Sequence, residues 1–164
     1  SNTSFVKVED ELEHTRNYLS IQSLRFPDKL TWDIRCPEYL RDLSIPPLVI
    51  QTFVENSIKY ALTMEEPIHI DVHLTFLEEA ERSRMKITIK DNGRGFDPTV
   101  LRELQSGRSV ETERGERTGI WNVQRRLKLL FKEDVDMVFA NDLETGGAVV
   151  ELILPIHPRM EVTT

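Results

Sequence analysis

The chain has 164 residues, of which 39% are hydrophobic, and this is enough for one compact α/β domain with an appended element. The formal net charge of −7 argues against nucleic acid as the main partner. The single cysteine, Cys36, excludes an intrachain disulfide and a cysteine zinc site, and no run of about 18 apolar residues exists to span a membrane, so we expect no membrane contact by this chain.

The N-terminal segment is expected to form one long helix over residues 5–26, because it contains no glycine or proline and Pro27 follows it. Apolar residues recur there at alternating spacings of three and four. Leu12 and Leu19 fit a packing seam, whereas Thr15 and Gln22 fit it poorly. Two roles stay open: this helix docks on the domain, or it is the end of a longer bundled element that begins upstream.

The middle of the chain alternates between apolar and polar residues, which predicts strands with one buried face at 30–35, 68–76 and 85–90, and a short partner strand at 38–43. The last two long strands form a hairpin across the charged segment 78–84. Between the strands, Pro46-Pro47 begin a helix that runs from about 48 to 62, because proline is tolerated in a first helical turn.

The C-terminal part begins with residues 97–118, which are charged and show little periodicity. A loop of this length in a compact domain is typical of a functional lid or of a disordered segment. A helix is expected at 119–132 and two strands at 135–140 and 148–154, joined by a turn that contains Gly146-Gly147.

The first motif that carries chemistry is the stretch from Asp91 to Gly95, in which an acidic residue ends a strand and two glycines follow it. The carboxylate can accept a hydrogen bond from an exocyclic amine, and Gly93 and Gly95 let the backbone approach a flat ring closely. Alone, the same residues fit a tight turn, because Asn-Gly is a common turn pair.

The second motif lies on the helix after Pro47. Its polar face carries Asn56 and Lys59, three residues apart, so that their tips converge. An amide oxygen is a hard ligand suited to Mg²⁺, and an ammonium group neutralises phosphate. Taken alone, an ordinary solvated helix face is the more common fate of such residues.

The third motif is the start of the helix at Thr118-Gly119-Ile120, where free backbone N–H groups and the helix dipole favour an anion. By itself it fits a simple helix cap. The three motifs occur in a fixed order along the chain, with a long lid before the third. It is improbable that a turn, a solvated helix face and a helix cap would occur independently in this order.

This order resembles the ATP-binding domain of the GHKL superfamily (gyrase, Hsp90, histidine kinase, MutL), and most of all sensor histidine kinases of the LytS/YesM type. The resemblance covers roughly residues 8–156. It implies an α+β fold: a two-layer α/β sandwich of the Bergerat type, in which a mixed sheet packs against helices, with an extended N-terminal helix. The matching sequence segments are Glu9-x-Glu11-Leu12, Tyr18-Leu19-x-Ile21-Gln22, Arg25-Phe26, Pro46-Pro47-Leu48-x-x-Gln51, Val54-Glu55-Asn56, Asn122-Val123 and Arg125-Arg126-Leu127.

The resemblance also implies roles for single residues. Asp91 accepts from the adenine amino group, Gly93 and Gly95 shape its pocket, and Asn56 holds Mg²⁺ between the phosphates. The residues implied on the phosphate side are Lys59, Tyr60, Arg117, Thr118, Gly119 and Ile120, which meet ATP when the lid closes. Glu55 is implied as a catalytic assistant.

Two positions depart from the family pattern. Arg117 stands where a glycine is expected, and Ala148 stands where a threonine usually follows the late glycines. Arg117 either adds a phosphate contact or weakens closure of the lid. The affinity for ATP is therefore left open by the sequence.

The activity that the resemblance implies is transfer of the γ-phosphoryl group of ATP to a histidine on an upstream helix, for relay to a response regulator. The family's phosphoacceptor motif, a His-Pro-His-Phe-like sequence, does not occur in this chain. His14 lies outside any such motif and is expected at the surface, so this fragment is not expected to phosphorylate itself. We expect residues 1–26 to end the dimerisation and phosphoacceptor region, 27–158 to form the catalytic domain, and 159–164 to form a tail. The full-length protein is expected to be a homodimer, anchored in the membrane with this portion in the cytoplasm, in which the phosphoacceptor helix belongs to the same or the partner subunit.

Two other functions stay open. A GHKL ATPase of the gyrase or MutL kind is disfavoured, because Thr52 occupies the position of the carboxylate that activates water in those relatives. A non-enzymatic nucleotide sensor is kept open by Arg117 and Ala148. An anti-sigma serine kinase fits less well, because it does not explain the long N-terminal helix.

Overall fold

The computed structural model describes residues 5–61, 65–107 and 118–156. The helices and strands, in chain order, are β1 (Val6–Lys7), α1 (Val8–Arg25), β2 (Leu30–Arg35), the 3₁₀ turn η1 (Glu38–Leu40), β3 (Ser44–Ile45), α2 (Val49–Ala61), β4 (Ile68–Glu78), β5 (Ser83–Asp91), α3 (Pro98–Ser106), α4 (Thr118–Phe131), the 3₁₀ turn η2 (Lys132–Asp134), β6 (Asp136–Asn141) and β7 (Ala148–Pro155). None of the helices in these ranges is both long and apolar enough to cross a bilayer.

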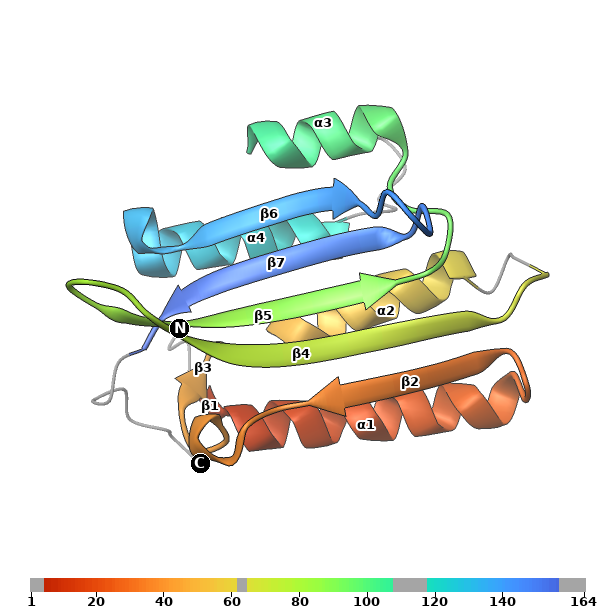
Figure 1. Ribbon diagram of the computed structural model, residues 1–164, viewed down its shortest axis with the longest axis horizontal. Helices are drawn as coiled ribbons and strands as arrows, with labels where there is room; N and C mark the ends of the chain where they lie inside the picture. Colours follow the sequence, from red (N-terminus) through yellow and green to blue (C-terminus); the bar gives the residue numbers. More distant parts are fainter. Residues whose placement is uncertain (1–4, 62–64, 108–117, 157–164) are drawn as a thin grey trace.

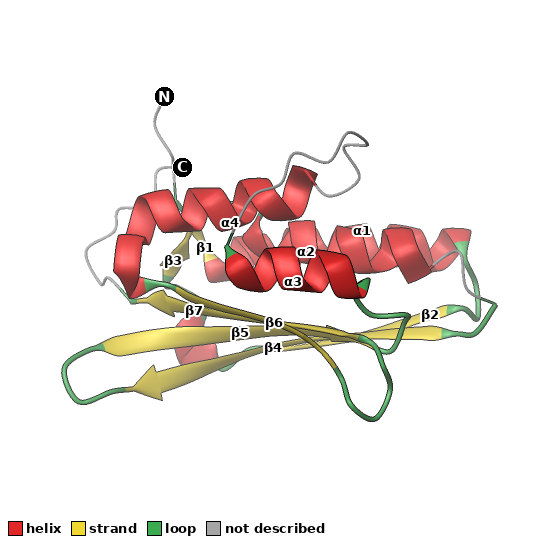
Figure 2. Cartoon of the chain, turned by 90° about the horizontal axis from the view of Figure 1, so that it is seen from above, coloured by secondary structure: helices red, strands yellow, loops and turns green. Residues whose placement is uncertain are grey.

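Five strands form one mixed sheet in the order β2-β4-β5-β7-β6. The pair β2–β4 is parallel, and the remaining pairs are antiparallel. Helices α1 to α4 all lie on one face of this sheet (Figures 1 and 2). The predicted α+β fold, a two-layer sandwich with a mixed sheet against helices, is therefore confirmed.

The core lies between the two layers and follows the alternation in the sequence. In β4 and β5 every second side chain is buried against the helices, as at Val72 and Ile87. The helix α2 contributes Phe53 and Ile58 from its apolar stripe. Because β5 is the central strand, its last residue, Asp91, comes to the end of the sheet between β4 and β7.

The helix α1 packs against α2 and β2 and shares the hydrophobic core with them. Leu12 and Leu19 are buried, as their spacing predicts. Thr15 and Gln22 are buried as well, which the seam argument did not anticipate; the Thr15 hydroxyl donates to the Glu11 carbonyl 2.9 Å away and so needs no water. The packing agrees with docking of this helix on the domain.

Glu11 joins α1 to the start of α2. Its carboxylate is only 2% exposed and accepts from the backbone N–H groups of Leu48 (2.8 Å) and Gln51 (3.1 Å), which have no intrahelical partner at a helix start. Burial raises the pKa of the Glu11 carboxyl, although these N–H groups oppose the rise. Leu48 has a left-handed backbone with φ 65°, so the carboxylate holds this entry into α2 in a conformation that leucine rarely adopts.

Two sequence predictions were wrong. Residues 38–43 do not form a strand: the turn η1 follows Pro37, and the pairing strand β3 comes after it and joins β1. The predicted lid at 97–118 contains a helix over Pro98–Ser106, because Asp97 accepts from the Thr99 N–H as its cap and Val100 and Leu104 bury one face. The remainder of the predicted lid, 108–117, lies outside the described residues.

Candidate functional site

Asp91 ends β5 with a carboxylate that is almost completely buried, at 6% exposure. One oxygen, Oδ1, accepts from the backbone N–H of Gly93 (2.8 Å) and of Ala148 (3.2 Å). The other, Oδ2, accepts from the hydroxyl of Ser57 on α2 (2.7 Å). The acid is therefore fixed by donors from three separate segments, which compensate for the burial of its charge.

Near Asp91, two backbone segments approach each other so closely that only glycine fits at the points of contact. A Cβ on Gly147 would lie 1.9 Å from the Asp91 carbonyl oxygen. Gly95 has a φ of 77°, and a Cβ there would lie 2.2 Å from the Gly146 carbonyl oxygen. The loop after β5 and the β6–β7 turn thus pack directly on one another, at the end of the sheet where α4 begins (Figure 1).

Asn141, the last residue of β6, fixes the same loop. Its amide accepts from the Phe96 N–H (2.7 Å) and donates to the Phe96 carbonyl (3.0 Å), so both backbone groups of one residue are held by one side chain. The loop that follows Asp91 is therefore held from β6 as well as from β7.

Asp142 connects the β6–β7 turn to β5. Its carboxylate lies 2.6 Å from the Lys90 ammonium and also accepts from the N–H groups of Glu144 and Thr145. The bond from Lys90, helped by these two N–H groups, lowers the pKa of Asp142 to about 2. A depressed carboxyl pKa stabilises the fold fully above the unfolded value near 3.8, and this contribution is lost as the pH falls toward 2.

We expect Lys90→Met to raise the pKa of Asp142, leaving only the two backbone donors to hold it down. Unfolding by urea at pH 5 and pH 3 should then show a smaller loss of stability on acidification than in the wild type. Carbon NMR titration of the Asp142 carboxyl measures the shift directly. An unchanged pKa in the variant would contradict the assigned cause.

The polar face of α2 carries the residues predicted for the phosphates. Asn56 is half-buried, and Glu55 and Lys59 are exposed. Glu55 accepts from the side-chain amide of Gln51 at 2.9 Å. The side chain of Tyr60 lies outside the described residues, as does Arg117.

The helix α4 begins at Thr118, one residue before the predicted start, and it packs against α2. A Cβ on Gly119 would lie 3.3 Å from the Thr52 methyl group, so glycine permits close packing of the two helices here. The Ile120 side chain is buried in the core and packs there as an ordinary apolar residue. The side chain of Thr118 is outside the described part of the chain.

The comparison with known proteins decides the family. The family described as histidine kinase-, DNA gyrase B-, and HSP90-like ATPase matches residues 45–158. The chain belongs to this family. Among its members it is an ATP-binding catalytic domain of the two-component sensor histidine kinase type, as the sequence motifs predicted.

Two curated relatives are similar over nearly the whole chain. The sensor protein LytS of Oceanobacillus iheyensis is 33% identical over 156 residues, which is 94% of this chain and 26% of that protein. The sensor histidine kinase/phosphatase LytS of Staphylococcus aureus strain Mu50 is 30% identical, over 95% of this chain and 26% of that protein. This histidine kinase-type domain thus spans about a quarter of the length of these relatives.

Solved structures share the fold. The catalytic domain of the histidine kinase ThkA, in a nucleotide-free form, superposes with a TM-score of 0.63 at 11% identity, over 98% of this chain and 100% of that one. Full-length ShkA in complex with AMPPNP has a TM-score of 0.65 at 14% identity, over 99% of this chain and 33% of that one.

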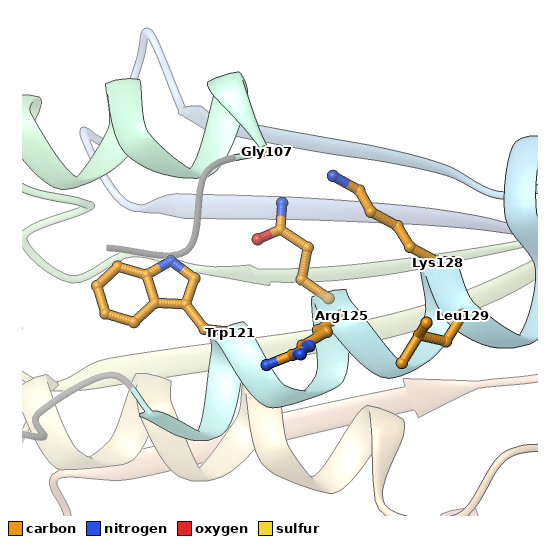
Figure 3. Close-up of a pocket in the computed structure, with 6 residues that line it drawn as sticks. Gly107, Trp121, Arg125, Lys128 and Leu129 are labelled. Atoms are coloured by element: carbon orange, nitrogen blue, oxygen red, sulfur yellow. The ribbon is translucent and has the colours of Figure 1, made fainter. Parts of the chain in front are cut away.

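The kinase-type domain also has a cavity of about 430 Å³ between α3 and α4 (Figure 3). Among the described residues its lining consists of Gly107, Trp121, Gln124, Arg125, Lys128 and Leu129, and none of these is predicted to bind ATP. The indole nitrogen of Trp121 is buried and, within the described ranges, has no hydrogen-bond partner. Gln124 donates to the Leu104 carbonyl and ties α4 to α3 beside the cavity.

Sequence reasoning missed two residues that hold the Asp91 region, Ser57 and Asn141. Ser57 could have been found, because it is a polar residue on the apolar stripe of α2, three and four positions after Val54 and Phe53. Asn141 gave no such signal, since its partner, Phe96, is 45 residues away in the chain.

Proposed function

We propose that this domain binds Mg²⁺-ATP and donates the γ-phosphoryl group to a histidine on an upstream helix, for relay to a response regulator. The observation that carries the proposal is the buried Asp91 carboxylate, fixed by three donors at the end of β5. These donors hold the buried charge in place, and the acceptor position that no described residue fills is available to an N–H donor of a ligand.

The adenine amino group is the partner that we assign to Asp91. Donors among the described residues use three of the four lone pairs of its carboxylate, which leaves one for an N–H donor of a ligand. Gly93 and Gly95 keep the adjoining loop free of side chains, which suits the flat face of a purine.

Asn56 is the residue that we assign to Mg²⁺. Within the described residues no cluster of three or more His, Cys, Asp or Glu side chains is arranged to hold a metal ion. A single amide oxygen on a half-exposed helix face nevertheless fits Mg²⁺, which keeps several waters and binds mainly through substrate phosphates. When bound, the ion neutralises phosphate charge during transfer.

The residues of this chain that would bind the phosphates come from two helices. Lys59 and Tyr60 belong to α2. Thr118 and the backbone N–H groups of Gly119 and Ile120 belong to the first turn of α4, and Arg117 precedes it in the sequence. Donors and cations fixed around a transferring phosphoryl group lower the barrier by positioning and charge neutralisation. Glu55, next to Asn56, is proposed to assist at the acceptor side.

Steady ATP hydrolysis is a poorer fit than phosphotransfer. The position one turn before Asn56 is Thr52, whose hydroxyl donates to the Leu48 carbonyl at 2.6 Å. That hydroxyl is occupied and has no basic character, so it cannot activate water.

The chain is proposed to be part of a longer, membrane-anchored homodimer whose catalytic portion is cytoplasmic, where ATP is available. In this proposal residues 1–26 end the dimerisation and phosphoacceptor region, 27–158 form the catalytic domain and 159–164 form a tail. The acceptor helix would come from the same or the partner subunit.

The test is phosphotransfer in the full-length protein that contains this chain. We expect label from γ-labelled ATP to appear on histidine, and Asn56→Ala to reduce the rate by about a hundredfold or more, because charge neutralisation at the phosphates is lost. Glu133→Ala, also a truncation to alanine but at an exposed position in η2, serves as the control. ATP binding without any transfer to histidine would instead favour a nucleotide sensor.

A further inference from the structure

We propose that Ser57 is a positioning residue for nucleotide recognition: its hydroxyl decides which oxygen of Asp91 meets the base, and so fixes the preference for an amino-purine. The inference rests on the proposed role of Asp91 toward adenine. Ser57 itself need not touch the nucleotide.

The contacts around Asp91 are unequal. Oδ1 receives two backbone N–H groups, from Gly93 and Ala148, and so has no lone pair left. Of the described residues, only Ser57 donates to Oδ2, through its hydroxyl at 2.7 Å. The single lone pair that remains for a ligand is therefore on Oδ2, beside Ser57.

The backbone donors cannot fix this arrangement alone. Without the hydroxyl, Oδ2 has two open lone pairs, and the carboxylate can turn about its last torsion angle while Oδ1 keeps at least one N–H donor. Ser57 is 9% exposed and sits on the buried side of α2, so water does not readily replace its hydroxyl. The side chain at position 148 offers no substitute, because it is alanine.

Ser57 also connects the two ends of the proposed nucleotide site. It follows Asn56 directly on α2, so the turn of helix that carries the residue assigned to Mg²⁺ also carries the group that orients the acid for the base. The bond to Asp91 thereby fixes α2 against the end of β5 across 34 residues of chain.

The test compares ATP with purine riboside triphosphate, which lacks the 6-amino group and so cannot donate to Asp91. Affinities of both nucleotides, with Mg²⁺ present, are measured by calorimetry on this chain. The discriminating quantity is the ratio of the two dissociation constants. We expect Ser57→Ala to weaken ATP binding five- to twentyfold while the affinity for purine riboside triphosphate stays within about twofold of the wild type.

Ser57→Thr keeps the hydroxyl and should restore the wild-type ratio. Unchanged binding of purine riboside triphosphate shows at the same time that the Ser57→Ala site is folded. Equal weakening of both nucleotides, or no weakening of either, would overturn the inference and leave Ser57 a packing residue.

The variant Asp91→Asn distinguishes a failure of the role proposed for Ser57 from a failure of the proposed contact between Asp91 and adenine. If Asp91→Asn lowers the ratio and Ser57→Ala does not, only the role of Ser57 is refuted. If Asp91→Asn leaves the ratio at its wild-type value, the assignment of adenine to Asp91 fails, and the role of Ser57 fails with it.

Discussion

Replacing Asp91 with asparagine is expected to weaken the binding of Mg²⁺-ATP by about ten- to a hundredfold, the equivalent of one hydrogen bond to a charged group. The amide oxygen of asparagine can still accept from Gly93 and Ala148, so the loop keeps its backbone contacts. Its NH₂ group then replaces the acceptor Oδ2 and faces the adenine amine with a second donor. We therefore expect weaker binding with the fold preserved.

Calorimetric titration with Mg²⁺-ATP measures this loss, and thermal unfolding checks the fold. Asp97→Asn is the matched control, because Asp97 is exposed and caps α3 through a carbonyl-type oxygen that asparagine also has. We expect wild-type affinity there. Full ATP affinity in Asp91→Asn would show that the base is recognised elsewhere.

The individual strands of the sheet could be predicted almost completely from the sequence, but their order in the sheet could not. Alternation over residues 68–76 and 85–90 gives β4 and β5 with the correct buried faces, because a strand on a half-covered sheet must repeat every two residues. The order of the strands is a different matter. That β2 pairs in parallel with β4, and that β7 lies between β5 and β6, depends on packing of the whole chain.

The helix α3 was not predicted, although the sequence contains residues typical of a helix start and a helix end around it. Asp97 as a cap, Pro98 in the first turn and Gly107 with φ 72° at the end are ordinary helix boundaries. Only Val100 and Leu104 are buried in α3, one turn apart, so this helix has too short an apolar stripe to give a clear periodicity. The polar composition of residues 97–118 therefore suggested a loop, while the residues at the boundaries of α3 indicated a helix.

The site divides in the same way. Asp91, Gly95 and the Gly146-Gly147 turn were found from the chain, since each is tied to a strand end or a tight turn. The hydroxyl of Ser57 and the amide of Asn141 act on residues 34 and 45 positions away, and no local pattern encodes such a pair. Contacts of this kind hold the loop after β5 in place, and they could be found only from the structure.

Gly147→Ala is expected to destabilise the domain by about 3 kcal/mol or more, because its Cβ would overlap the backbone of a central strand. The added carbon would lie 1.9 Å from the Asp91 carbonyl oxygen and 2.8 Å from the Asn92 Cα, neither of which is the end of a flexible side chain. Relief requires β7 to move away from β5 at the point where the Ala148 N–H reaches Asp91. ATP affinity should therefore fall together with stability.

Gly146→Ala isolates this overlap from the ordinary cost of replacing a glycine. Gly146 has a φ of 78° but open space around its Cβ position, so alanine there should cost only about 1–2 kcal/mol, the penalty for a left-handed backbone. Urea unfolding of both variants gives the comparison. Similar losses of stability in the two would mean that the β6–β7 turn yields easily, and that Gly147 does not set the distance between β7 and the Asp91 carboxylate.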